Sequence, residues 1–163
     1  MMALFGSAAL SRVQTLIDPT LGTAIGDMTS GGGLAAAFDG VVSQNAIPSA
    51  TSIGVSTGYI GKSWPAAKII TGFRVYGSSD YGFDSVSGSG AVITATLLGN
   101  TVNNTITATA LGSGTVNDFN ASPSIVVLTG LTISSFAYSW IKIESTTASQ
   151  NMFCAECQFY EDV

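Results

Sequence analysis

The sequence contains no histidine and few charged residues. Of its 163 residues only 9% are charged, against about 25% in an average soluble domain. The absence of histidine excludes Ser-His-Asp and Cys-His catalysis and any histidine-ligated metal site. The 5 Lys and Arg residues and the formal net charge of −5 are too little positive charge to neutralise a phosphate backbone. We therefore expect no nucleic-acid partner.

Long apolar runs are also missing. Hydrophobic residues make up 46% of the chain, which is enough for a core. Ser, Thr, Asn and Gly interrupt every run well before the roughly 18 residues of a membrane-spanning helix. The apolar stretch 1–10 has no basic residue before it, and Arg12 follows it, the reverse of the order in a secretory signal. We expect neither a membrane span nor a signal peptide.

Two cysteines and two loop acids are the remaining candidates for chemistry. Zinc would need four ligands, and Cys154 and Cys157 have no second Cys pair or His to join them. Residues three apart on a strand point to opposite faces, so a disulfide between them would have poor geometry. Asp80 and Asp84 could form a hydrolytic pair, but ten acids make some such loop pair inevitable. We expect no enzyme.

Most of the chain shows the pattern of short strands. From residue 34 onward, alternating or β-branched runs are separated by turn signals, with no long helical pattern. The expected strands cover residues 69–76, 92–98, 105–110, 125–128, 140–144 and 152–160. This arrangement predicts an all-β fold, an antiparallel sandwich or barrel, over residues 34–163.

Residues 1–33 have a different pattern. Apolar residues from Leu4 to Ile17 recur at a spacing of three to four, which predicts a short amphipathic helix. Asp18-Pro19 should end this helix, and the Gly-rich stretch 29–33 is typical of a flexible connector. We expect an N-terminal arm that docks on a neighbouring subunit. The alternative is an extra helix or strand that caps its own domain.

The segment from Ser85 to Ile141 contains a single charged residue, Asp118. Interface cores are depleted of charged residues. We therefore expect much of this surface to lie against other subunits, as in a homo-oligomer. The alternative is a Ser- and Thr-rich surface hydrated on a monomer.

Five segments, in this order, carry a resemblance to a known family. They are Ala37–Gly40, Tyr59–Trp64, Ile70–Asp80, Tyr138–Ile143 and Ala155–Tyr160. Together they resemble the discoidin-type, or coagulation-factor type C, galactose-binding-like domains, in the form found in tailed-phage virion proteins. The resemblance spans residues 34–163. It implies an eight-stranded jelly-roll β-sandwich that binds sugars or partner surfaces through loops at one end.

The same resemblance implies a structural Ca²⁺ near the first loop. By position its carboxylate ligands are Asp39 and Glu156, which suit a hard cation. Val41 stands where a second acid is common in the family. The alternative is that Asp39 caps a turn and that Glu156 pairs with a cation such as Lys142.

Sugar binding in the family uses loop aromatics and polar side chains, and this chain offers five candidates. They are Asn45, Tyr59, Trp64, Tyr81 and Phe83. Trp64 and Phe83 could equally close the ends of the sandwich.

The sequence thus predicts a non-catalytic structural protein of a phage virion, such as a head or tail decoration, a fibre subunit or an adaptor. Its location would be the virion, assembled in the host cytoplasm with other virion proteins as partners. The alternative is a carbohydrate-binding module for a cell-surface glycan. The two overlap, because a virion subunit can bind a host glycan.

Overall fold

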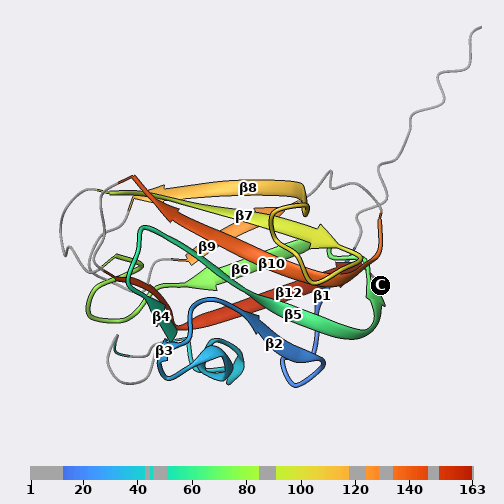
Figure 1. Cartoon of the computed structure of the whole chain (residues 1–163), viewed down its shortest axis with the longest axis horizontal. Coiled ribbons are helices and arrows are strands. Elements are labelled where there is room, and N and C mark those ends of the chain that lie inside the picture. Colours follow the sequence, from blue (N-terminus) through green and yellow to red (C-terminus); the bar gives the residue numbers. More distant parts are fainter. Residues whose placement is uncertain are drawn as a thin grey trace, which may run out of the picture.

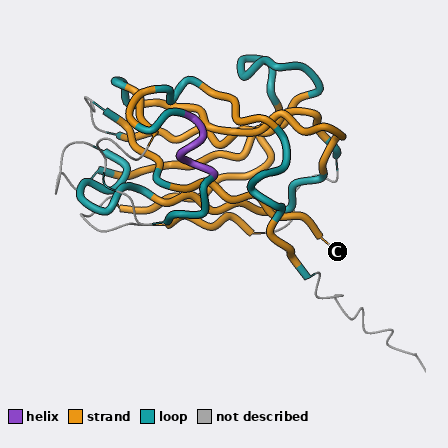
Figure 2. Tube along the Cα trace, turned by 90° about the horizontal axis from the view of Figure 1, so that it is seen from below, coloured by secondary structure: helices purple, strands orange, loops and turns teal. Residues whose placement is uncertain are grey.

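The computed structural model describes residues 13–42, 45, 51–84, 91–117, 124–128, 134–146 and 151–162. Regular structure in this part of the chain is almost entirely β-strand, arranged in two layers (Figure 1). One short 3-10 helix, η1 (Leu34–Phe38), drawn in purple in Figure 2, packs against strands β2 (Thr23–Gly26) and β12 (Glu156–Asp162). The described residues include no helix with the length and apolar character needed to cross a membrane.

The larger layer is a five-stranded antiparallel sheet with the order β2-β5-β10-β7-β8. Its strands are β2 (Thr23–Gly26), β5 (Thr57–Lys68), β10 (Phe136–Ser145), β7 (Val92–Asn100) and β8 (Thr109–Asn117). The central strand β10 pairs with β5 on one side and with β7 on the other. This sheet therefore has one face toward the core and one face outward.

The opposing layer is a four-stranded antiparallel sheet with the order β1-β12-β6-β9. Its strands are β1 (Gln14–Leu16), β12 (Glu156–Asp162), β6 (Gly72–Tyr76) and β9 (Ser124–Leu128). A small third sheet joins β11 (Met152–Cys154), β4 (Thr51–Ile53) and β3 (Ser30–Gly31). The prediction of an all-β antiparallel sandwich is confirmed.

The core lies between the two larger sheets and follows the strand alternation. On β6, Phe73 and Val75 are fully buried, whereas Arg74 and Tyr76 lie on the other face and are partly exposed. The largest fully buried apolar side chains of this core are Phe73, Phe83, Met28, Ile60, Ile70, Ile93, Leu97, Ile141, Ile143 and Met152. Burial of each such side chain stabilises the fold by about 1.5–3 kcal/mol before entropy is counted.

The described part of the predicted arm, residues 13–33, contributes strands to the sandwich. Strand β1 pairs with β12, β2 with β5 and β3 with β4. A strand therefore stands at Gln14–Leu16, where the apolar spacing predicts the end of a helix. Pairing with β12 accounts for the difference: Ile17 donates its N–H to Phe159 O at 2.9 Å, and among the described residues 13–17 only Ile17 is buried. Residues 1–12 lie outside the described part.

Two further boundaries differ from the sequence prediction. The strand expected at 105–110 begins only at Thr109, because Asn side chains bind the preceding backbone in turns. The strand expected at 152–160 is divided at Ala155 into β11 and β12, which belong to different sheets.

The two cysteines are free and buried. This agrees with the expectation that they form no disulfide with each other. Burial raises the pKa of both the Cys154 and the Cys157 thiols. Cys157 packs in the main hydrophobic core, as a small apolar side chain does.

Candidate functional sites

A tight loop follows β6 at one end of the sandwich, and it carries Tyr81. The loop is closed by Ser78, whose N–H and hydroxyl both donate to Gly82 O, at 2.6 and 3.0 Å. Gly82 has a positive φ of 72°, a conformation that favours glycine. The Ser78 side chain is fully buried, so it anchors the loop while Tyr81 stays at the surface.

Tyr81 and Asn45 lie in one loop cluster. Tyr81 is 39% exposed and its ring stacks on Phe153, with centroids 6.1 Å apart. Ser79, two residues before Tyr81, donates its hydroxyl to Asn45 Oδ1 at 2.8 Å. We refer to Asn45, Ser79 and Tyr81 as the loop cluster. It combines an accessible ring with side-chain groups that can bind hydroxyls.

Trp64 and Phe83 are packing residues. Trp64 is 6% exposed, meets Phe159 edge to face at 5.5 Å, and donates its ring N–H to Ser139 Oγ at 3.0 Å. Phe83 is fully buried. The structure places both rings inside the sandwich and not on a ligand-facing surface. This packing role is the alternative that the sequence left open.

Tyr59 lies apart from the loop cluster, on the outward face of β5. Its side chain is partly buried and lines a groove of about 520 Å³. Its backbone N–H donates to Asp27 Oδ1 at 2.7 Å. The five predicted ligand residues therefore divide among the loop cluster, the core and this groove.

Asp39 and Glu156, the two predicted metal ligands, lie close together. Asp39 follows η1, and its Oδ1 accepts the Val41 N–H at 2.9 Å, so it caps a turn. Glu156 begins β12, is 1% exposed, and accepts the Gly40 N–H on Oε2 at 3.1 Å.

Burial raises the pKa of the Glu156 carboxyl group to about 7. The Gly40 N–H lowers this pKa, while the negative charge of Asp39 raises it. Lys62, which also lowers it, is 5% exposed, and its Nζ donates to Pro19 O at 2.8 Å. The opposite charge that acts on Glu156 is thus Lys62. The cation named from the sequence, Lys142, instead pairs with Glu144 at 2.6 Å.

The chemistry of these two carboxylates suits Ca²⁺. Both offer hard oxygen ligands, and Glu156 is a buried acid whose charge is incompletely balanced. Among the described residues there is no cluster of three or more His, Cys, Asp or Glu side chains. Any further ligands within this part of the chain would have to be other oxygens, such as backbone carbonyls.

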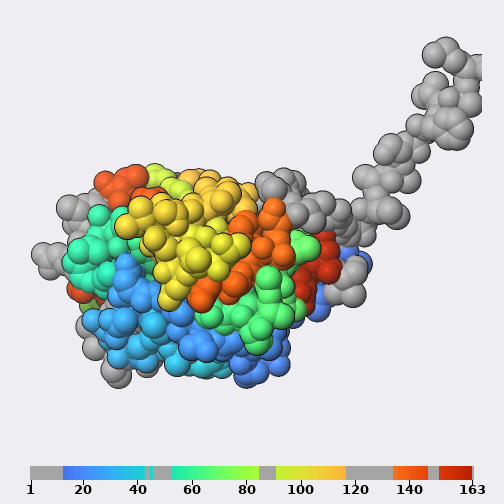
Figure 3. All heavy atoms as spheres, turned by 45° about the vertical axis from the view of Figure 1, so that its right-hand side comes forward, coloured from blue at the N-terminus to red at the C-terminus, as the bar shows by residue number. Residues whose placement is uncertain are grey.

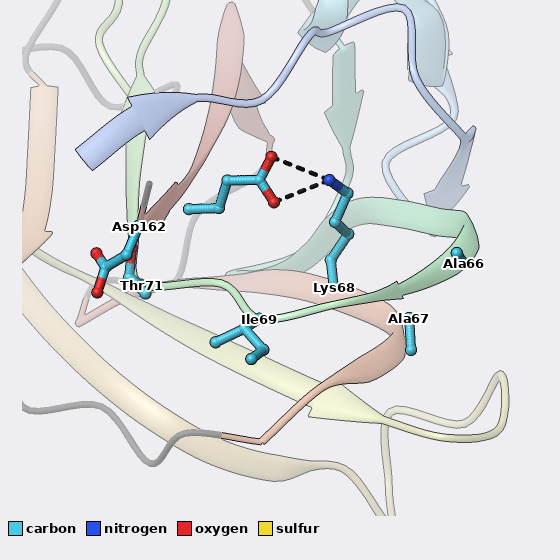
Figure 4. A pocket seen from close by; sticks show the side chains of 7 residues that line it. Ala66, Ala67, Lys68, Ile69, Thr71 and Asp162 are labelled. Carbon is cyan, nitrogen blue, oxygen red and sulfur yellow. Dashed lines mark hydrogen bonds and ion pairs between the residues drawn. The ribbon is translucent and has the colours of Figure 1, made fainter. Parts of the chain in front are cut away.

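A second cavity, of about 420 Å³, lies at the Lys68 edge of the sandwich. Lys68 Nζ binds both carboxylate oxygens of Glu161, at 2.9 and 2.8 Å (Figure 4). The other lining residues are Ala66, Ala67, Ile69, Thr71 and Asp162. Because Lys68 and Glu161 neutralise each other and no aromatic ring lines it, this cavity is a weaker ligand candidate than the loop cluster.

No protein-family model and no curated protein matches this sequence. Solved structures do match the fold. The family 32 carbohydrate-binding module of C. perfringens NanJ, solved with galactose, has a TM-score of 0.64 and 16% identity. The match covers 91% of this chain and 100% of that one. The chain therefore has a galactose-binding-like β-sandwich fold.

Two further neighbours are lectins. The lectin domain of lectinolysin, solved with Lewis b antigen, has a TM-score of 0.62 and 16% identity, covering 90% of this chain and 98% of that one. A serum f-lectin from striped bass, Morone saxatilis, has a TM-score of 0.63 and 14% identity, covering 90% and 49%. These three structural neighbours are thus a carbohydrate-binding module and two lectins.

Proposed function

We propose that the protein is a carbohydrate-binding module whose ligand site is the loop cluster. The observation that carries this proposal is Tyr81, an aromatic side chain that is 39% exposed and held by Phe153 beside the Ser79–Asn45 pair. Solved structures of similar fold are described as complexes with galactose and with Lewis b antigen, which supports a sugar as the ligand class.

The three side chains of the loop cluster supply complementary interactions. The Tyr81 ring offers an apolar face for the C–H groups of a sugar and a hydroxyl for hydrogen bonding. Asn45 Oδ1 accepts the Ser79 hydroxyl. This leaves the Asn45 amide NH₂ as a donor and Ser79 Oγ as an acceptor for sugar hydroxyls. The proposed module binds its ligand without changing it chemically.

We also propose that Asp39 and Glu156 hold a structural Ca²⁺. The ion would supply positive charge beside a buried carboxylate that Lys62 only partly balances. Its role would be to fix the turn after η1 against β12, and not to contact the sugar directly.

The virion role predicted from the sequence gains no support from these structural neighbours. It rests on the sequence resemblance alone and remains a prediction. Carbohydrate binding is the better-supported function because the neighbouring structures include a module and a lectin solved with sugars.

The test is a glycan array probed with the full chain, followed by calorimetry on the strongest ligand. Tyr81→Ala should abolish measurable binding, whereas Tyr81→Phe should retain most of it because the ring remains. Val102→Ala, at an exposed position outside the loop cluster, is the control and should bind like the wild type. Absence of any glycan ligand, or unchanged affinity in Tyr81→Ala, would contradict the proposal.

A further inference from the structure

The groove beside Tyr59 lies on the outward face of the five-stranded sheet and shares no residue with the loop cluster. Its volume is about 520 Å³, within the roughly 300–1,000 Å³ of ligand pockets. One wall is the connection between β7 and β8, residues 101–108, drawn in yellow over this face of the molecule in Figure 3. Its lining includes Asp27, Leu34, Tyr59, Asn103, Thr105 and Trp140.

The wall formed by residues 101–108 is braced by two asparagines. Asn100 Nδ2 donates to Asn104 O at 2.7 Å and to Thr107 Oγ1 at 3.0 Å. Asn104 Oδ1 accepts the Ile106 N–H at 2.9 Å. These bonds order the connection before any ligand arrives, which lowers the entropy cost of binding.

The floor of the groove contains Trp140, which is 1% exposed. Strand alternation places Trp140 on the outward face, opposite to its buried neighbours Ile141 and Ser139. It pairs with Gly61 on β5, where an added Cβ would lie 2.7 Å from the Trp140 Cα. Trp140 points outward and is nevertheless nearly buried. Other residues therefore cover this part of the outward face, and the groove is the opening that remains.

The opposite wall is formed by Asp27 and Tyr59, which are joined by two hydrogen bonds. Asp27 Oδ1 accepts the Tyr59 N–H at 2.7 Å, and the Asp27 N–H donates to Tyr59 O at 3.1 Å. Gly26 allows this close approach, because a Cβ there would lie 2.1 Å from Tyr59 O. The carboxylate and the aromatic residue are therefore fixed relative to each other.

Three polar side chains lining the groove have no hydrogen-bond partner among the described residues. They are the Tyr59 hydroxyl, the Asn103 amide and the Thr105 hydroxyl. With Asp27 they offer both donors and acceptors. The lining contains no Lys or Arg, and Asp27 adds negative charge. An anionic ligand is therefore disfavoured, while a ligand rich in neutral hydroxyls is matched.

We propose that this groove is a second saccharide-binding site, selective for a neutral sugar. The Tyr59 ring and Leu34 contact the apolar C–H face of the sugar, and Asp27, Asn103 and Thr105 bind its hydroxyls. The site goes beyond the proposed function because it does not require the loop cluster. In Figure 1 the loop after β6, which carries Tyr81, and the β7–β8 connection, which forms a wall of the groove, lie at opposite ends of the sandwich. A chain with both sites would bind a branched or polymeric glycan more tightly than either site alone, by effective concentration.

The experiment is ¹⁵N-resolved NMR of the full chain titrated with galactose, fucose and N-acetylglucosamine, with glucuronic acid as the charged comparison. At least one neutral sugar should shift the amide signals of Tyr59 and Asn103–Ile106 saturably. Glucuronic acid should shift them less. If none of these neutral sugars moves those signals, the proposed second site is wrong.

Variants separate this site from the loop cluster. Asn103→Ala should weaken the groove titration roughly tenfold, the value of one hydrogen bond of about 1.4 kcal/mol. Tyr59→Phe tests the hydroxyl while keeping the ring, and Val102→Ala is the control in the same connection. Wild-type affinity in both Asn103→Ala and Tyr59→Phe would overturn the proposal.

The variant Tyr81→Ala distinguishes failure of the two sites. If the groove binds, its signals should still shift in Tyr81→Ala, even when binding at the loop cluster is lost. Shifts confined to Ser79 and Tyr81 in the wild type would retain the proposed function and overturn the second site. Shifts confined to the groove residues would support the second site and contradict binding at the loop cluster.

Discussion

The backbone N–H of Gly40 donates to Oε2 of Glu156 at 3.1 Å, across 116 positions of sequence. This bond ties the turn after η1 to the first residue of β12. The carboxyl group that accepts it is 1% exposed, and its pKa is raised to about 7, chiefly by burial. The contact joins two distant segments, and the burial of the carboxyl group that accepts it makes the fold sensitive to proton concentration.

Stability in the absence of Ca²⁺ should fall as the pH rises. The folded Glu156 binds its proton more tightly than the unfolded chain, whose pKa is near 4.5. The contribution of Glu156 to the free energy of unfolding is therefore greatest below pH 4.5 and declines between about pH 4.5 and 7. The total loss is on the order of 3 kcal/mol.

Urea unfolding in chelator at several pH values measures this effect. Glu156→Gln removes the titrating group and should flatten the dependence over that interval. Asp18→Asn changes an exposed acid and should leave the wild-type slope in place. Equal slopes for the wild type and Glu156→Gln would contradict the prediction.

Calcium should stabilise the protein at neutral pH. A ligand that binds only the folded state adds about 2.7 kcal/mol at a concentration one hundred times its dissociation constant. The wild type should therefore melt at a higher temperature in Ca²⁺ than in chelator, and Asp39→Ala should lose this response. Glu144→Gln alters an acid paired with Lys142 and should keep it. An identical melting curve with and without Ca²⁺ would show that the carboxylates hold no such ion.

Trp64→Phe should lower stability without changing the affinity for a glycan. The substitution removes the ring N–H that binds Ser139 Oγ, and Ser139 is fully buried. A buried hydroxyl left without this partner costs about 1–3 kcal/mol. Thermal unfolding measures the loss, and calorimetry at a temperature where the variant is folded measures binding. If folded Trp64→Phe lost affinity for the glycan while Tyr81→Ala bound normally, Trp64 would be the ligand-binding residue and Tyr81 would not.

The low charge between Ser85 and Ile141 leads us to expect self-association. Within the described part of this segment, Val92 is 36% exposed and Val102 is 56% exposed. Light scattering over a range of concentrations should show oligomers, and Val102→Lys should reduce them if this connection lies in the contact. A monodisperse monomer at high concentration would show that the surface is simply hydrated.

Strand alternation made most of the fold predictable. Ile141 and Ile143 stand on either side of Lys142, on the other face of the strand from it, and are buried as expected. The alternation also holds information about the ligand candidates that the prediction did not use. Tyr59 and Trp64 are five positions apart on β5, an odd separation, so they lie on opposite faces of the sheet.

Contacts between distant segments were less accessible from the sequence. Lys62 acts on Glu156 because β5 and β12 face each other across the core, whereas Lys142 lies on the outward face. The groove wall was also missed. Residues 105–108 have β-propensity, but Asn104 Oδ1 accepts the Ile106 backbone N–H and Asn100 Nδ2 donates to the Thr107 hydroxyl, and these bonds hold the segment in turns.

The pairing of β1 with β12 determines how the sandwich would respond to mechanical force. Gln14 and Asp162 are register partners at one end of an antiparallel pair. A pull applied at these two positions would act across the strands and break their hydrogen bonds one at a time, starting from that end. The segment up to Leu16 would peel away before the core is loaded. The fold should therefore resist tension poorly when it is pulled at Gln14 and Asp162. The loop cluster and the groove are not part of the β1–β12 pair, so they would remain intact while β1 separates.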